Sequence, residues 1–191
     1  MRHRFGGTLK DALLVVSLLA FGLSILYAPA VQAQQSGART SLLAREPATA
    51  RSGLEKAGAL ATRWQPDAGL RKIFISTATA EGTATEDDGW SYVFYSKRLR
   101  RSYEVSILGS MTMGSEGTDA GAIASLENLP KDFTESNKAL TLAREGGYQP
   151  RTEIRMTLSK RAGEPATWEI SSGNPAYLVD AESGKFLRVK E

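Results

Sequence analysis

Cysteine is absent from the 191 residues, and histidine occurs only once, as His3. Without thiols or imidazoles, the chain beyond that position cannot form a disulfide, a Cys/His zinc site, a thiolate nucleophile or a Ser-His-Asp triad. Packing alone must therefore stabilise the fold, and the lack of a lipobox cysteine argues against a lipid anchor. We expect no metal, no cofactor and none of the common hydrolase mechanisms.

The first 33 residues have the pattern of a secretory signal peptide. Basic residues precede an apolar run at 12–27, and the small residues Val31 and Ala33 frame a cleavage site. The apolar run is shorter than the roughly 20 residues of a spanning helix, and Pro29 follows it, so cleavage is favoured over anchoring. The sequence predicts a periplasmic or secreted protein cleaved near Ala33, which would meet a membrane only through an uncleaved signal.

The charge balance does not indicate a nucleic-acid partner. The chain has 24 basic and 21 acidic residues, a net charge of +3. Three of the basic residues and one acidic residue lie in the signal peptide, so the net charge of the remainder is +1. Nucleic-acid binding relies on clustered cationic charge, and an exported chain this close to neutral does not predict it.

The first half of the exported chain predicts a helix and three strands. Residues 34–51 lack an apolar period and are expected to form a flexible leader. A capping-box pattern at Ser52 and Glu55 opens a helical period, and alternation then predicts strands up to about residue 109. The following interval, 110–129, starts with Gly, Ser, Thr and Met residues and is predicted to be a linker.

The second half, 130–191, predicts the same order of elements. A helix with Asp132 or Thr134 as its N-cap ends at Gly146 and precedes up to four strands. Three anchors match between the halves: Trp90 with Trp168, Tyr103-x-Val105 with Tyr177-x-Val179, and Gly109 with Gly184. The sequence therefore predicts an α+β fold with two repeats, 52–109 and 130–191, each a helix packed on an antiparallel β-meander. The alternative is that two such stretches align by chance.

The C-terminal half resembles a known family. It contains Ala139-Leu140, Trp168-Glu-Ile170 and the run YLVDAESGKFL over 177–187. These residues are similar to PepSY and PepSY-like domains, whose last hairpin has an aromatic residue, Val-Asp-Ala, a turn and Gly-Lys before an apolar residue. The first half matches poorly, because Glu104-Val105-Ser106 lacks the Asp and the turn. The residues that carry the motif are Trp168, Tyr177, Val179, Asp180, Gly184 and Lys185.

The resemblance implies a cystatin-like sheet, export, and a non-catalytic role in binding or restraining a partner. Regulation of a peptidase is one such role in PepSY-like proteins. No protease domain follows Glu191, so any such action is expected in trans.

A dense basic run is the candidate partner-binding site. Its cations are Lys97, Arg98, Arg100 and Arg101, between two predicted strands. The run is either a solvated turn that protects strand edges or a surface that meets an anionic partner.

Each of two acidic clusters has a structural interpretation and a functional one. The run 86–88 is a solvated hairpin tip or, less simply, a carboxylate pair for sugar cleavage. The run with Asp180, Glu182 and Gly184 is too short for a calcium loop and lacks its bidentate Glu. We expect Asp180 to accept amide hydrogens of a tight turn instead.

The sequence thus favours an exported, non-enzymatic binding module that holds an envelope protein, such as a peptidase, by a sheet face or by β-augmentation. One alternative is a small-ligand carrier, which requires an apolar pocket of about 300 Å³ or more between helix and sheet. The other is a carboxylate-dependent cell-wall enzyme, which requires convergent ionisable groups with shifted pKa values.

Overall fold

The structure, a computed structural model, describes residues 48–117, 120–150 and 153–191. The predicted signal peptide and residues 34–47 of the predicted leader lie outside these ranges. The described residues form an eight-stranded antiparallel sheet with three helices, which confirms the predicted α+β class. None of the helices in these ranges is long and apolar enough to cross a membrane.

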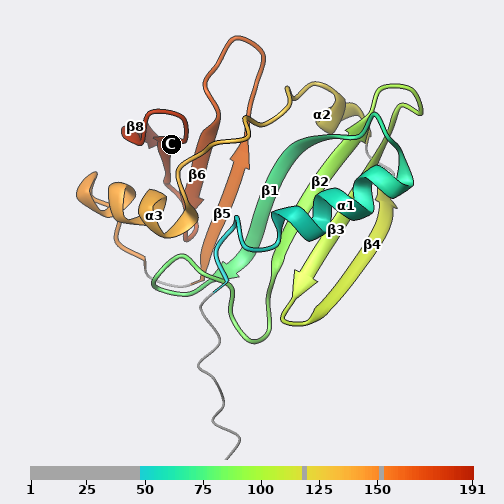
Figure 1. The fold of residues 1–191 in the computed structure, drawn as a ribbon. Helices are drawn as coiled ribbons and strands as arrows, with labels where there is room; N and C mark the ends of the chain where they lie inside the picture. The colour runs from blue at the N-terminus through green and yellow to red at the C-terminus, as the bar shows by residue number, and fades with distance from the viewer. Residues whose placement is uncertain (1–47, 118–119, 151–152) are drawn as a thin grey trace, which may run out of the picture. The chain divides into compact units, whose positions relative to one another are not determined.

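The strands form two meanders that join into one sheet (Figure 1). The strand order is β4-β3-β2-β1-β5-β6-β7-β8, and β1 pairs with β5 in antiparallel orientation at the centre. A helix precedes each meander, and a third, short helix lies between them. The elements are α1 (Leu54–Trp64), β1 (Gly69–Ala78), β2 (Trp90–Ser96), β3 (Arg101–Leu108), β4 (Met111–Gly117), α2 (Ala120–Ala124), α3 (Ser136–Glu145), β5 (Ile154–Ser159), β6 (Thr167–Ser171), β7 (Ala176–Asp180) and β8 (Lys185–Lys190).

One face of the sheet carries a single apolar core that spans both meanders. The register aligns Ile73 of β1 with Leu158 of β5, and Leu158 with Trp168 of β6, so these buried side chains point to the same face. Helix α1 contacts β2 and β3, and α3 contacts β6, β7 and β8, so both helices cover this face (Figure 1). We call the opposite side the open face; its residues include Phe74, Val93, Glu104, Met113, Thr157, Glu169, Leu178 and Arg188.

Two tryptophans link the meanders inside this core. Trp90 and Trp168 are buried, and their rings pack edge to face with centroids 6.0 Å apart. Each indole N–H donates to a backbone carbonyl ahead of a helix, Trp90 to Ala48 at 2.9 Å and Trp168 to Thr134 at 2.7 Å. Aromatic burial of this kind contributes strongly to stability when the polar N–H is satisfied. The two halves therefore share one core.

The matched anchors of the sequence lie on corresponding strands. Trp90 and Trp168 belong to the second strand of each meander, and Tyr103 and Tyr177 belong to the third. Gly109 and Gly184 lie in the turns that follow the third strands, with φ of 59° and 65°. Only glycine adopts these backbone conformations at little cost, which explains why both turns contain it.

The predicted linker over 110–129 is wrong for its first part. Strand β4 lies there and pairs with β3 from Leu108 opposite Met111 to Ser102 opposite Gly117. Strand β4 is an exposed edge strand, and its apolar alternation is limited to Met111 and Met113, which is too short to be recognised. The first meander therefore has four strands, as the second does.

The predicted boundary of the leader at residue 51 is too late. Ala50 is buried, its N–H donates to the Ser136 hydroxyl at 3.2 Å, and its carbonyl accepts from the Tyr92 hydroxyl at 3.0 Å. Burial raises the pKa of Tyr92, so this hydroxyl remains protonated and can donate. Arg51 donates to Glu135 at 2.6 Å and stacks over Phe133. These contacts connect the start of the first half to the start of α3.

The predicted helix starts also need correction. Helix α1 begins at Leu54 with Gly53 as N-cap and no side-chain cap, while the Ser52 hydroxyl donates to the Thr49 carbonyl instead. Helix α3 begins after Glu135, not after Asp132 or Thr134, and the predicted closure at Gly146 is confirmed. Ahead of α3, the Thr134 backbone is held by long-range contacts, since its N–H donates to the Ala181 carbonyl and its carbonyl accepts from Trp168, both at 2.7 Å.

Candidate functional site

The predicted basic run forms the tight turn between β2 and β3, and part of its charge is used within the fold. The Arg98 backbone N–H donates to Asp67 at 3.0 Å, and its guanidinium donates to Gln65 at 2.6 Å. Hydrogen bonds from the Arg98 backbone and the Ser96 hydroxyl lower the pKa of Asp67, so this carboxylate is ionised where it closes the turn. The turn interpretation is therefore supported by direct contacts.

The remaining cations of this run differ in their contacts. Arg101 forms an ion pair with Glu116 of β4 at 2.9 Å. Lys97 and Arg100 are exposed and form no ion pair within the described ranges. A partner-binding role of Lys97, Arg98, Arg100 and Arg101 stays a prediction. Of these four, Lys97 and Arg100 are the cations available to pair with an anionic partner.

The motif residues of the C-terminal hairpin have structural roles. Asp180 accepts hydrogen bonds from the backbone N–H of Glu182 at 2.8 Å and of Ser183 at 3.1 Å, which confirms the predicted turn. Lys185 is the first residue of β8 and follows Gly184. The ring of Tyr177 packs against the ring of Tyr148, with centroids 5.1 Å apart. Trp168 and Val179 lie in the core. Within the described residues, no group of three or more His, Cys, Asp or Glu side chains is placed to hold a metal ion.

We predict that Asp180→Asn lowers stability at neutral pH and does so less in acid. Burial raises the pKa of Asp180, but hydrogen bonds from Ser183 and Glu182 outweigh it and bring the pKa below its ordinary value of 3.8. The ionised carboxylate therefore stabilises the fold above the unfolded-state pKa, and this contribution disappears as the pH falls through the folded-state pKa. For a partly exposed group we expect a loss of about 0.5–1 kcal/mol at pH 7.

Urea unfolding of the wild type and of Asp180→Asn at pH 7 and at pH 3 measures this difference. The gap between the two proteins should shrink at the lower pH. A gap of equal size at both pH values would show that the carboxylate charge has no part in the turn.

In the acidic run 86–88, two side chains are exposed to solvent and the third bonds to the sheet. Asp88 accepts hydrogen bonds from the backbone N–H of Ser76 at 3.1 Å and of Thr77 at 2.6 Å, near the end of β1. Glu86 and Asp87 are exposed. This arrangement supports the hairpin interpretation over the carboxylate pair, because backbone N–H groups already bond to the carboxylate of Asp88.

The two edge strands of the sheet differ sharply in composition. Strand β4 reads MTMGSEG and is largely exposed, whereas β8 reads KFLRVK and carries three cations. Lysine, arginine and proline on an edge strand prevent pairing with other chains, and β4 contains none of them. Hydrogen bonds from Trp64 and Arg101 lower the pKa of Glu116, so the one charged residue of β4 is an ionised acid held at its end.

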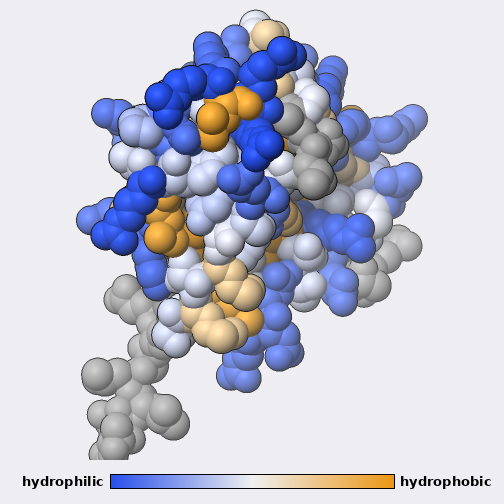
Figure 2. Space-filling view, turned by 90° about the vertical axis from the view of Figure 1, so that its right-hand side faces the viewer, coloured by the Kyte–Doolittle hydropathy of each residue, from blue (hydrophilic) through white to orange (hydrophobic). Residues whose placement is uncertain are grey.

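The side of the molecule at β4 is weakly polar at its centre. Figure 2 turns this side to the viewer and shows pale residues at its centre, with hydrophilic residues and several hydrophobic groups around them. Met111 and Met113 are 57% and 58% exposed, and the register places both on the open face. This edge was not predicted from the sequence, although the absence of Lys and Arg from 109–117 is visible there.

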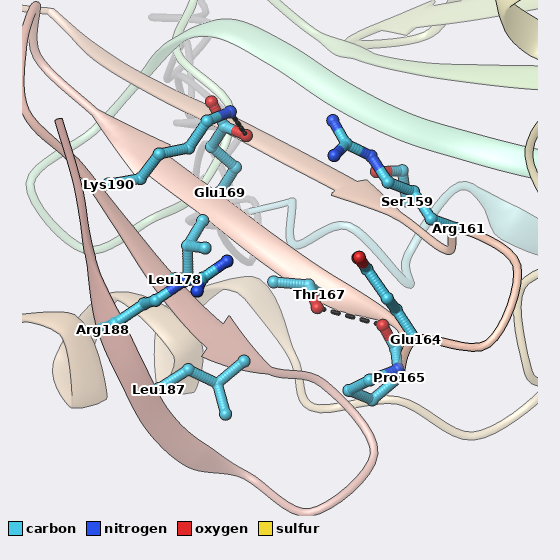
Figure 3. A pocket seen from close by; sticks show the side chains of 10 residues that line it. All are labelled: Ser159, Arg161, Glu164, Pro165, Thr167, Glu169, Leu178, Leu187, Arg188 and Lys190. Atoms are coloured by element: carbon cyan, nitrogen blue, oxygen red, sulfur yellow. Dashed lines mark hydrogen bonds and ion pairs between the residues drawn. The ribbon is translucent and has the colours of Figure 1, made fainter.

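A pocket of about 540 Å³ lies on the open face over the second meander (Figure 3). Its volume is within the roughly 300–1,000 Å³ of small-molecule sites. It is not between helix and sheet, where the carrier alternative placed a cavity. Its lining residues are Ser159, Arg161, Glu164, Pro165, Thr167, Glu169, Leu178, Leu187, Arg188 and Lys190.

The pocket contains both paired and unpaired charges. Lys190 forms an ion pair with Glu169 at 3.0 Å, and the Thr167 hydroxyl donates to the Pro165 carbonyl at 3.0 Å. The guanidinium groups of Arg161 and Arg188 have no hydrogen bond or ion pair to any described residue. These two residues were not predicted from the sequence, because Arg161 follows β5 in an isolated bridge with Leu126 and Arg188 lies on β8, 27 positions later.

Comparisons with known proteins identify no family. No protein-family model matches the chain, and no curated protein matches it. The fold is similar to a solved structure from Clostridium difficile 630 described as a "putative lipoprotein", with a TM-score of 0.49 and 12% sequence identity. The match covers 75% of this chain and 93% of that chain. The PepSY-like resemblance is not tested by these comparisons and stays a prediction.

Proposed function

We propose that the chain is an exported, non-catalytic binding module that holds an envelope protein by pairing an extended segment of that protein with β4. The observation that carries the proposal is the contrast between the edges. Strand β4 is exposed and free of Lys, Arg and Pro, whereas β8 carries Lys185, Arg188 and Lys190. An edge without such protection is the surface to which a further strand adds by main-chain hydrogen bonds.

We also propose that the two helix-plus-meander halves are PepSY-like repeats. The matched tryptophans, the Tyr-x-Val pairs and the turn glycines support this, since each pair lies on corresponding elements. In this proposal the halves have diverged in their last strands. The second repeat keeps a protected edge, and the first repeat provides the binding edge.

The chemistry around β4 defines the segment that would fit. The small residues of β4 leave room for an added strand, and Met111 and Met113 offer adaptable apolar contacts on the open face. The Arg101–Glu116 ion pair places the basic turn at the end of β4 near Glu116. Lys97 and Arg100 would then meet acidic residues next to the added strand. The partner segment is therefore extended, apolar on one side and followed by acidic residues; an envelope peptidase is one candidate that the resemblance implies.

The proposal predicts that lysines on β4 abolish capture of the partner. In Met113→Lys combined with Ser115→Lys, two cations stand on the exposed edge strand and oppose pairing. We expect the amount of specific partner recovered from envelope extract under gentle crosslinking to fall at least about tenfold, equivalent to about 1.4 kcal/mol. Quantitative mass spectrometry of the captured proteins measures it.

The matched control is Val189→Lys on the other edge strand, where the side chain is also exposed. It should capture as much partner as the wild type. Equal losses from both edges, or no loss from the β4 variant, would count against β4 as the binding edge. Reversing Lys97 and Arg100 to Glu should weaken capture to a smaller degree and make it less dependent on salt.

A further inference from the structure

We propose that the pocket on the open face binds a carboxylate carried by a short apolar group. This site is separate from β4, and its ligand does not depend on the partner proposed above. Three observations support it: two unpaired guanidinium groups, a small apolar surface beside them, and a β-bulge that brings the two together.

The charges of the pocket favour a single negative charge on the ligand. Lys190 neutralises Glu169 through an ion pair at 3.0 Å. The remaining charged groups of the pocket are the cations Arg161 and Arg188 and the carboxylate of Glu164. Figure 3 shows Arg188 reaching from β8 toward Thr167, and Arg161 on the other side of the pocket with its guanidinium beside Ser159. A guanidinium binds a carboxylate through two parallel hydrogen bonds. The Glu164 carboxylate on the same rim repels a more highly charged anion, which disfavours a phosphate dianion.

The apolar part of the pocket lies beside Arg188. Leu178 forms part of its floor, and Leu187 is 45% exposed although it is a large apolar side chain. Pro165 adds a further apolar surface on the other side (Figure 3). Together they suit an aliphatic group of a few carbons. Covering exposed leucine surface is favourable by roughly 25 cal/mol per Å² of apolar area.

A β-bulge explains why apolar and cationic groups meet here. Leu178 pairs with Arg188, but the next residue of β7, Val179, pairs with Phe186, so Leu187 is the extra residue of β8. Neighbours on a regular strand point to opposite faces, whereas here both Leu187 and Arg188 line the pocket on the open face. Bulges commonly redirect a side chain next to a functional site.

Two sources supply this chemistry. One is the C-terminal carboxylate of a peptide that ends in an aliphatic residue, and the other is a free short-chain carboxylic acid. N-acetyl-leucine represents the first source and hexanoate the second. N-acetyl-leucinamide has the same apolar group without the charge, and inorganic phosphate has charge without the apolar group.

The experiment is a titration of the exported chain with these four probes, followed by the NMR shifts of the leucine methyl groups. We expect N-acetyl-leucine or hexanoate to bind at least tenfold more tightly than N-acetyl-leucinamide or phosphate, and the tighter of the two acids identifies the source. Arg161→Gln and Arg188→Gln should each weaken the tighter acid at least fivefold. Arg155→Gln is the control, since Arg155 is exposed on β5 and does not line the pocket.

Several results would overturn the proposal. One is equal affinity for N-acetyl-leucine and N-acetyl-leucinamide, and another is tighter binding of phosphate than of either acid. Unchanged affinity for the acid in Arg161→Gln and Arg188→Gln, or no shift of the Leu178 and Leu187 methyl signals with any probe, would also contradict it. The Met113→Lys/Ser115→Lys variant should bind the acid as the wild type does. Failure of this site and failure of the β4 edge are therefore distinguishable.

Discussion

Replacement of Trp168 by alanine is expected to lower the free energy of unfolding by about 3–5 kcal/mol, the range for a large buried aromatic residue. Trp168 is 0% exposed and packs edge to face on Trp90, at 6.0 Å, and on Phe133, at 6.4 Å. Alanine leaves a cavity between the two meanders. It also leaves the Thr134 carbonyl without the indole donor at 2.7 Å.

Urea unfolding measured by far-UV circular dichroism tests this, with Trp64→Ala as the matched control. Trp64 stacks on Tyr103 at the periphery, with ring centroids 5.1 Å apart, and is only half-buried. Trp64→Ala should therefore lower the free energy of unfolding clearly less than Trp168→Ala does. Trp168→Phe should fall between the two, because it keeps an aromatic ring but not the N–H. If Trp168→Ala were as mild as Trp64→Ala, the described core would be wrong.

Separation of the chain into 34–130 and 131–191 is expected to abolish folding of both pieces. The cut exposes β1 and β5 as new edges and uncovers Ile73, Met156 and Leu158, which are buried in the intact protein. It also removes the Trp90–Trp168 packing and the hydrogen bond from Ala50 to Ser136. A domain of about 60 residues is only marginally stable even with a complete core, and neither piece keeps a complete core.

The dispersion of backbone amide signals in NMR spectra measures the fold of each piece. Neither should show the dispersed spectrum of a folded protein alone, whereas co-expression of both pieces should restore it. Co-expression is the control, because it contains the same cut but keeps the β1–β5 pairing. A cooperative unfolding transition in 131–191 alone would show that each half is an independent domain.

The fold was predictable where apolar periodicity and turn residues agree. Trp168 and the alternation of Ile154, Met156 and Leu158 predicted the second meander, because one face of each strand is buried. Strand β4 was missed because an exposed edge strand requires no apolar alternation. The end of the leader was placed too late, since the contact of Ala50 with Ser136 of the other half is a long-range effect that local pattern does not contain.

The candidate sites divide in the same way. The basic run of 97–101 was visible because its charges are adjacent in sequence, yet the structure uses Arg98 and Arg101 in local contacts. The pocket could not be predicted, because Arg161 and Arg188 line it only through the order β5-β6-β7-β8. The bulge at Leu187 also disrupts the alternation from which its side-chain direction would be inferred.

Hydrogen exchange of β4 in the presence of the captured partner tests the binding-edge proposal most directly. Backbone amides of an exposed edge exchange faster than amides paired on both sides. On binding, we predict that exchange within Met111–Gly117 slows at least tenfold, while exchange within Lys185–Lys190 of β8 does not change. Unchanged exchange in β4 with the partner bound, or protection of β8 instead, would contradict the claim that β4 holds the partner.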